Sequence, residues 1–145
     1  MDIEVTRTPE REDLAVLSRG IQSYNQRFLP DEVALEADNY FAVFARDAHG
    51  QVCGGIRANA FWDYCIIELL WLADNCRGHG VGRQLLEAAE AHALAQGFSA
   101  VRVETLDFQA KPFYEKLGYT VYGELADHPK GHTTYCLVKR LKVTD

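Results

Sequence analysis

The stretch Arg77-Gly78-His79-Gly80-Val81-Gly82 decides the fold of this sequence. It follows an apolar run that ends at Leu72, and from Val81 onward apolar residues recur at the spacing of a helix face. A glycine-rich turn between a strand and a helix lets a phosphate group approach the N–H groups that the first helical turn leaves unpaired. Arg77 adds a cationic fork that suits phosphate oxygens. The stretch therefore predicts a phosphate-binding strand–turn–helix unit.

The spacing of these glycines excludes two common phosphate-binding motifs. A P-loop requires GxxxxGK followed by Ser or Thr, whereas Arg83 and Gln84 follow Gly82 here. A dinucleotide fingerprint requires GxGxxG, whereas glycine occupies every second position of this segment. A plain structural turn, in which the glycines serve only the tight bend, remains the alternative at this point.

Strand and helix patterns on either side of the stretch indicate a mixed sheet. Alternating or continuous apolar segments predict strands, and segments with helical periodicity predict helices. The expected strands are residues 3–7, 40–46, 52–61, 65–72, 99–105, 119–125 and 133–141, and the expected helices begin at Thr8-Pro9, within 77–82 and at Lys111. This order predicts one α+β domain over residues 1–145, with a central mixed sheet of about seven strands and helices on both faces.

The composition narrows the classes of function. Fifteen Lys and Arg against 21 Asp and Glu give a net charge of −6, which is opposite to the basic field that nucleic-acid binding needs. The apolar runs are much shorter than the roughly 20 residues of a membrane-spanning helix. The N-terminus lacks the basic leader of a secretory signal, and the four cysteines form no CxxC pair. We expect a cytoplasmic protein with no nucleic-acid or membrane partner and no metal.

Two motifs together resemble the Gcn5-related N-acetyltransferase (GNAT) superfamily. The first is Arg77-x-x-Gly80-x-Gly82 behind the strand Leu70-Trp71-Leu72, and the second is Phe113-Tyr114-Glu115-Lys116-Leu117-Gly118-Tyr119. The resemblance covers residues 40–122, and the predicted order of elements is also that of the family. It implies direct transfer of an acetyl group from acetyl-CoA to an amine, with no covalent enzyme intermediate.

The resemblance also implies which residues contact the cofactor. The turn formed by Arg77, Gly78, His79, Gly80, Val81 and Gly82 matches the loop whose backbone N–H groups hold the diphosphate of CoA. Leu70 and Leu72 lie on the segment that matches the strand splaying from its neighbour, which leaves a slot for pantetheine. Asp107 stands where the family often has Asn, and because a carboxylate accepts hydrogen bonds but cannot donate them, this contact departs from the family pattern.

Three residues are candidates for the chemistry. Tyr114 matches the tyrosine that in many family members protonates the departing CoA thiolate, and the alternative is a packed core aromatic. An alkylammonium must lose a proton before it can attack, so a base is also required. Glu68, which we expect to be buried on a central strand, and Glu104, on the facing strand, are the two candidates, and Glu68 is favoured. Its alternative role is a structural ion pair with Arg57 or Arg102.

The acceptor is the least determined part of the prediction. His128 and His132 lie in the loop before the last strand, where the resemblance implies contact with substrate, and Trp71 is a candidate for lining the acceptor pocket, as are Trp62, Tyr24 and Phe28. The small size favours a small-molecule amine, such as a metabolite or an antibiotic. A peptide or protein acetyltransferase and a non-catalytic acetyl-CoA-binding module are the alternatives. Some family members pair their last strands between subunits, so a homodimer is also open.

Overall fold

The computed structural model describes residues 1–29 and 40–142. The chain forms two compact units, residues 1–35 and 36–145, each of which is described by itself. The first contains α1 (Arg11–Asn25), which begins after Glu10 rather than after Thr8 and carries two acidic residues in its first turn. That residues 1–145 form one domain stays a prediction. None of the helices in the described ranges has the length and apolar character that would carry it through a membrane.

The predicted strand at residues 3–7 is wrong, because this segment forms no strand in the structure. A strand needs a neighbour for its backbone N–H and C=O groups. Among the residues described in the first unit there is no second strand that could supply one. Alternation of apolar and polar residues was present in the sequence, but the pairing partner was not.

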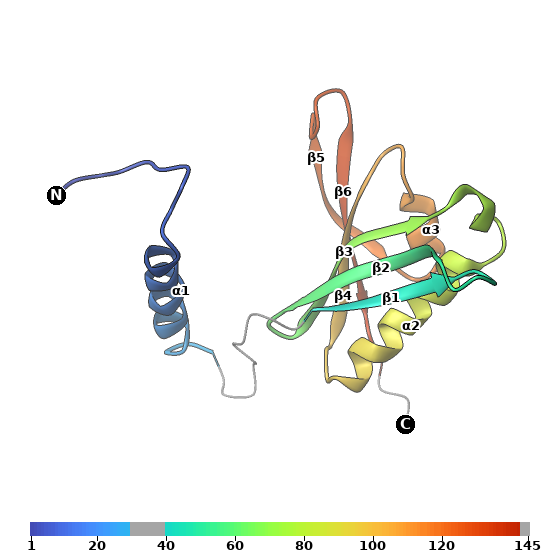
Figure 1. Cartoon of the computed structure of the whole chain (residues 1–145), viewed down its shortest axis with the longest axis horizontal. Helices are drawn as coiled ribbons and strands as arrows, with labels where there is room; N and C mark the ends of the chain where they lie inside the picture. The colour runs from blue at the N-terminus through green and yellow to red at the C-terminus, as the bar shows by residue number, and fades with distance from the viewer. Residues whose placement is uncertain (30–39, 143–145) are drawn as a thin grey trace. The chain divides into compact units, whose positions relative to one another are not determined.

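The second unit is built on a six-stranded mixed sheet, which confirms the α+β class although the expected number of strands was about seven. Its order is β1-β2-β3-β4-β6-β5, in which β3 and β4 are parallel and all other neighbours are antiparallel. The strands are β1 (Phe41–Arg46), β2 (Val52–Phe61), β3 (Tyr64–Leu72), β4 (Ala100–Leu106), β5 (Thr120–Ala126) and β6 (Thr133–Arg140). Figure 1 shows β3 and β4 running apart towards their carboxyl ends.

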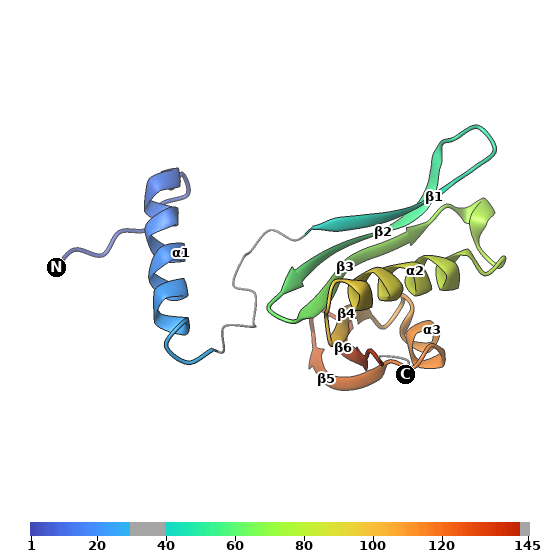
Figure 2. The same cartoon turned by 90° about the horizontal axis from the view of Figure 1, so that it is seen from below.

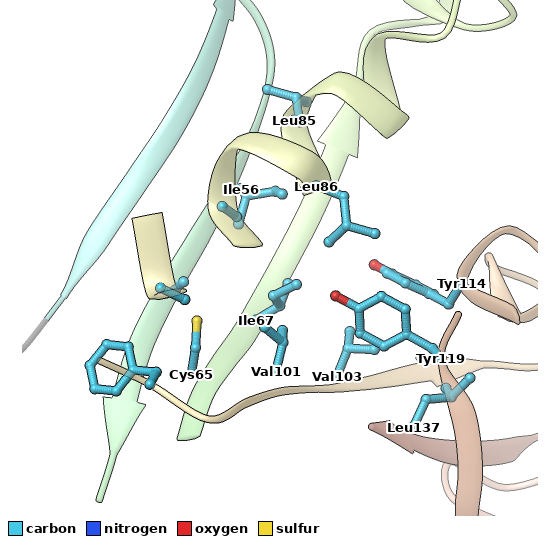
Figure 3. Packing of buried hydrophobic residues seen from close by; sticks show 14 of the residues in the cluster. Ile56, Cys65, Ile67, Leu85, Leu86, Val101, Val103, Tyr114, Tyr119 and Leu137 are labelled. Carbon is cyan, nitrogen blue, oxygen red and sulfur yellow. The ribbon is translucent and has the colours of Figure 1, made fainter. Parts of the chain in front are cut away.

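The connection between the two parallel strands contains η1 (Asp74–Cys76) and α2 (Val81–Ala95), and α3 (Lys111–Lys116) follows β4. Figure 2 shows α2 lying against one face of the sheet. The buried side chains of α2, which include Leu85 and Leu86, lie in one core cluster with inward residues of the central strands such as Ile67 and Val101 (Figure 3). This packing fixes the start of α2 just beyond the end of β3.

Candidate functional site

The site begins where β3 and β4 separate. The two strands pair in parallel from Tyr64 with Ala100 as far as Ile67 with Val103, and no ladder pair joins the described residues beyond that point. The remaining length of β3 still pairs with β2 on its other side. One edge of β3 therefore faces an open slot, and unpaired strand edges are costly unless something covers them.

A pocket of about 520 Å³ occupies this slot. Its walls come from residues 68–72 of β3, 103–105 of β4, 108–110 of the following loop, Arg77, and Phe113 and Tyr114 of α3. The predicted residues Glu68, Glu104 and Tyr114 are thus brought to one cavity, together with Leu70, Trp71, Leu72 and Arg77. This volume is in the range of small-ligand pockets.

Glu68 forms a β-bulge at the point of separation. In the pairing with β2, Arg57 lies opposite Leu69 and Ala58 opposite Ile67, so Glu68 is the extra residue. Its side chain accepts a hydrogen bond from Arg57 Nε at 3.2 Å and is 26% exposed, while the residue as a whole is exposed. The expectation that Glu68 is buried is therefore wrong, because the bulge opens its backbone to the slot. The ion pair with Arg57 is the structural partner that the sequence left as an alternative.

Glu104 lies across the slot from Glu68, on the first stretch of β4 without a parallel partner. It stands opposite Cys136 of β6, whose thiol lies 3.9 Å from Glu104 Oε1. Burial and this carboxylate raise the pKa of the Cys136 thiol. Arg102, two residues earlier, donates to the hydroxyl of Tyr122 at 3.1 Å. Both candidate bases therefore line the pocket, and only Glu68 has an ion-pair partner in the described structure.

The glycine-rich turn has the geometry of an anion-binding loop. Gly78 and Gly80 adopt φ values of +81° and +76°, which side chains rarely tolerate, and Gly80 is the N-cap of α2. No described atom lies within 4 Å of where a Cβ would stand on either glycine. In the described ranges the N–H groups of residues 78–83 have no hydrogen-bond acceptor. The loop therefore presents bare backbone donors to open space at a helix N-terminus.

Arg77 connects this loop to the slot. Its Nε lies 3.4 Å from the carbonyl oxygen of Leu72 and 3.8 Å from Asp74 Oδ1, and it lines the pocket. Leu72 lies on the strand segment that the resemblance places beside the cofactor, and its carbonyl oxygen accepts from Arg77 here. At Gly82 a Cβ would stand 3.4 Å from both Leu72 Cδ1 and Phe113 Cζ, so glycine lets α2 approach the strand closely.

Tyr114 is a buried residue whose hydroxyl remains available. The ring packs edge to face on Phe113 and Tyr119, and the residue is only 4% exposed. No described residue forms a hydrogen bond with the Tyr114 hydroxyl. Every fully buried side-chain oxygen among the described residues has a hydrogen-bond partner, so this hydroxyl oxygen must be partly accessible to solvent. Tyr114 is also one of the residues that line the pocket. Burial raises its pKa to about 12, which keeps it protonated at neutral pH.

Asp107 lies beside the pocket, and its carboxylate accepts hydrogen bonds from the β5–β6 hairpin. Its Oδ1 accepts from His132 Nδ1 at 2.9 Å and its Oδ2 from the N–H of Thr133 at 3.0 Å. These donors hold the pKa of the Asp107 carboxyl below its usual value, the Thr133 N–H having the larger effect. A direct contact between Asp107 and the cofactor stays a prediction, and both of its oxygens already have donors.

The two predicted substrate histidines are held within their own hairpin. His128 Nδ1 lies 3.0 Å from Thr134 Oγ1, and His132 pairs with Asp107. Neither lines the pocket. Trp71 does line it and is exposed, whereas Trp62 lies in the β2–β3 turn, and Tyr24 and Phe28 belong to the first unit.

In the loop that follows β4, the sequence indicated Asp107 and Ala110 through the family pattern, but not Phe108 and Gln109. Phe108, Gln109 and Ala110 form part of the pocket wall, and Phe108 is 62% exposed despite its aromatic ring. A large apolar residue just before the Pro112 turn was the available signal, because loops that expose aromatic residues often contact ligands. Phe113 was recognised only as part of the second motif.

Comparisons with known proteins agree on one family. The model of the acetyltransferase (GNAT) family matches residues 8–119. The chain is 37% identical to the blasticidin-S acetyltransferase of Streptomyces morookaense over 102 residues, 70% of this chain and 75% of that protein. It is 29% identical to the crystal structure of an acetyltransferase from Bacillus cereus, with a TM-score of 0.81, covering 95% of this chain and 98% of that one.

A third likeness concerns the fold alone. An aminoglycoside 6′-N-acetyltransferase complexed with coenzyme A superposes with a TM-score of 0.66 at 17% identity, covering 95% of this chain and 98% of that one. The divergent parallel strands, the glycine loop at the start of α2 and these likenesses lead to one conclusion. The chain belongs to the GNAT acetyltransferase family and is an acetyl-CoA-dependent N-acetyltransferase.

Proposed function

We propose that this chain transfers the acetyl group of acetyl-CoA directly to the primary amine of a small molecule. The observation that carries the proposal is the slot between β3 and β4, with bare N–H donors beyond one end and the unpartnered hydroxyl of Tyr114 in its wall. One relative supports the substrate class, since the protein that is 37% identical to this chain is named for the antibiotic blasticidin S.

The residues of the loop fit the diphosphate of CoA. The N–H groups of residues 78–83 point from a left-handed glycine turn and a helix start, where anions are stabilised. Arg77 adds a guanidinium at the mouth of the slot, and the free edge of β3 at Leu70 and Leu72 can pair with an extended amide chain. When bound, acetyl-CoA supplies the acetyl group as a reactive thioester.

The proposed chemistry needs a carboxylate that accepts a proton from the acceptor nitrogen and a phenol that donates a proton to the CoA sulfur. The acceptor ammonium first loses one proton to Glu68, directly or through a water, and Glu104 is the second candidate for the same role. The neutral amine nitrogen then attacks the thioester carbonyl carbon, the carbon–sulfur bond breaks, and the nitrogen loses its second proton to water. Tyr114 donates its phenolic proton to the departing sulfur, since burial raises the pKa of this phenol to about 12 and so keeps it protonated. The sum is an amide and free CoA.

The acceptor side of the pocket favours a small cationic amine with an apolar portion. Glu68 and Glu104 place two carboxylates beside the exposed rings of Trp71 and Phe108. Carboxylates attract ammonium groups, and aromatic faces bind both cations and planar apolar groups. The side chains of His128 and His132 have partners within the chain, so the carboxylates and the aromatic rings are the acceptor contacts that we propose.

Thermal unfolding with and without CoA tests the cofactor site. Binding to the folded state alone at 100 times Kd adds about 2.7 kcal/mol, a shift of several degrees. We expect Arg77→Glu to lose the shift. Arg140→Glu is the matched control, because Arg140 pairs opposite Ala100 at the far end of β4 and changes charge by the same amount. Absence of any shift in the unaltered protein would refute the proposal.

Release of free CoA thiol then tests the acceptor. Small polyamines, aminoglycosides, nucleoside amines and a peptide with a free N-terminus are compared at equal concentration. Faster release with small amines supports the proposal, and faster release with the peptide supports a protein acetyltransferase. Binding of CoA without release for any amine would leave only a non-catalytic module.

A further inference from the structure

The loop between β4 and α3, residues 107–110, forms one wall of the pocket. Phe108, Gln109 and Ala110 all line it, and the loop leads from Glu104 on one side to Tyr114 on the other. A displacement of this loop would therefore move groups on both sides of the slot. What holds the loop in place decides how accurately the pocket is formed.

The second half of the loop is fixed by its own local bonds. The side chain of Gln109 accepts from the N–H of Leu106 at 2.8 Å, and Thr105 Oγ1 accepts from the N–H of Ala110 at 3.3 Å. Phe108 has no such local restraint among the described contacts, and its ring is largely exposed. The first half of the loop must therefore be held from elsewhere.

That restraint comes from the tip of the β5–β6 hairpin. Asp107 makes three bonds with it: Oδ1 with His132 Nδ1 (2.9 Å), Oδ2 with the N–H of Thr133 (3.0 Å), and its own N–H with the carbonyl of Thr133 (3.0 Å). The imidazole of His132 also meets the ring of Phe108 edge to face, with centroids 4.8 Å apart. One histidine thus contacts two consecutive residues of the loop, and the second of them, Phe108, lines the pocket.

The hairpin tip is rigid enough to serve as an anchor. The N–H of His128 donates to the carbonyl of His132, and the N–H of His132 to the carbonyl of Pro129, both at 2.9 Å. Asp127 Oδ1 accepts from the N–H of Gly131 at 3.2 Å, and the hydroxyl of Thr134 bonds to the carbonyl of His128. The tip therefore has a defined shape of its own, and it can transmit that shape to residues 107–110.

We propose that His132 is a positioning residue that acts through Asp107 and Phe108 to hold the β4–α3 loop in the geometry that the reaction needs. This inference rests on the proposed function, because it treats the pocket as the place of acetyl transfer. His132 touches neither substrate nor cofactor in this account. Small displacements of positioning groups cost large factors in rate, roughly 10²-fold for an ångström.

A double-mutant cycle on kinetics tests the coupling. Asp107→Ala and His132→Ala are each expected to lower kcat/KM by roughly tenfold to a hundredfold, and the double variant is expected to be no worse than the poorer single variant. His132→Asn, whose amide can still donate to Asp107, is expected to recover part of the loss. His49→Ala, in the β1–β2 turn, is the control and is expected to leave kcat/KM unchanged.

Two outcomes of the cycle would overturn the inference. Multiplicative losses in the double variant would mean that the two residues act independently, as they would if Asp107 contacted the cofactor directly. A loss confined to the acceptor KM in His132→Ala, with no counterpart in Asp107→Ala, would mean that His132 contacts the acceptor.

A second measurement does not depend on catalysis. NMR titration of the Asp107 carboxyl in the ligand-free protein should give a pKa closer to the ordinary aspartate value in His132→Ala than in the unaltered chain, since one of its donors is lost. An unchanged pKa would overturn the inference even if the enzyme is active. If the pKa moves but CoA neither stabilises the protein nor is released, the contact stands and the proposed function fails.

Discussion

The rings of Tyr114 and Tyr119 meet edge to face with centroids 5.5 Å apart, and their hydroxyl groups have opposite surroundings. Tyr119 donates to Glu90 Oε2 at 2.8 Å, and Glu90 also binds Lys139 Nζ at 2.8 Å. Tyr114 has no bonding partner among the described residues and lines the pocket. The two phenols lie side by side in one buried cluster (Figure 3), but only the hydroxyl of Tyr119 has a hydrogen-bond partner among the described residues.

Removing the hydroxyl of Tyr114 should lower the reaction rate, and removing that of Tyr119 should lower the free energy of unfolding. Tyr114→Phe is expected to lower kcat by roughly 10²- to 10⁴-fold, the range for loss of a general acid, with little change in melting temperature. Tyr119→Phe is expected to cost about 1–3 kcal/mol, because the largely buried carboxylate of Glu90 loses a donor, with little change in kcat. Thermal unfolding and steady-state rates on both variants check this. Equal loss of kcat in both would show that ring packing, not the hydroxyl of Tyr114, matters.

The two carboxylates of the pocket can be distinguished by the pH dependence of their variants. Glu68→Gln is expected to lower kcat/KM by roughly 10²- to 10⁴-fold at neutral pH and by less at high pH. The reason is that an alkylamine with a pKa near 10 loses its own proton in alkaline solution and then needs no base. Glu104→Gln should show a smaller loss, and Glu124→Gln on β5 is the control. A larger, pH-dependent loss in Glu104→Gln would transfer the role to that residue.

Asp107 should contribute to stability in a way that disappears in acid. The Thr133 N–H and His132 hold the pKa of this carboxyl below its usual value of 3.8. A lowered pKa in the folded state stabilises the protein above the ordinary value, and this stabilisation is lost as the pH falls through the lowered value. The difference in urea midpoint between the unaltered chain and Asp107→Asn should therefore be largest near neutrality and shrink below pH 3.8. A difference that is constant with pH would contradict it.

Two strand glycines should differ sharply in their tolerance of alanine. A Cβ at Gly55 would stand 2.6 Å from the carbonyl oxygen of Val43, which is backbone and cannot move aside, whereas no described atom lies within 4 Å of a Cβ at Gly123. Gly55→Ala is expected to cost about 1–3 kcal/mol and Gly123→Ala within about 0.5 kcal/mol of zero. Denaturant midpoints of the two variants measure this, and equal midpoints would argue against close packing of β1 on β2.

Local patterns predicted most elements, because their causes lie within a few residues. The strand at 52–61 has the predicted bounds, and α2 begins at Val81 as the glycine turn indicates. The cavity that joins Glu68, Glu104 and Tyr114 was also implied by the two motifs. Homodimer formation, a cytoplasmic location and the roles of individual site residues stay predictions.

The errors have a common origin in partners that are distant in sequence. The apolar residues on both faces of β3 predict a buried Glu68, and only the pairing with Arg57 and Ala58 reveals the bulge. The hydrogen bonds of Asp107 with His132 and Thr133 were not predicted, because nothing near Asp107 in sequence indicates either residue. The segment 3–7 alternates like a strand, but alternation says nothing about whether a neighbouring strand is present.

The bulge at Glu68 fixes the length of β3 as well as its shape. Before it, Cys65 and Ile67 face the core, and after it Leu70 and Leu72 do, so the inward positions change from odd to even numbers. Deleting Glu68 would remove the extra residue and restore uninterrupted alternation, with Ile67, Leu70 and Leu72 still facing the core. The packing of β3 therefore does not need a residue at this position, and the candidate base occupies the one place in the strand that the core leaves free. Substitution of Glu68 removes the carboxylate alone, whereas deletion would also straighten the strand edge that faces the slot.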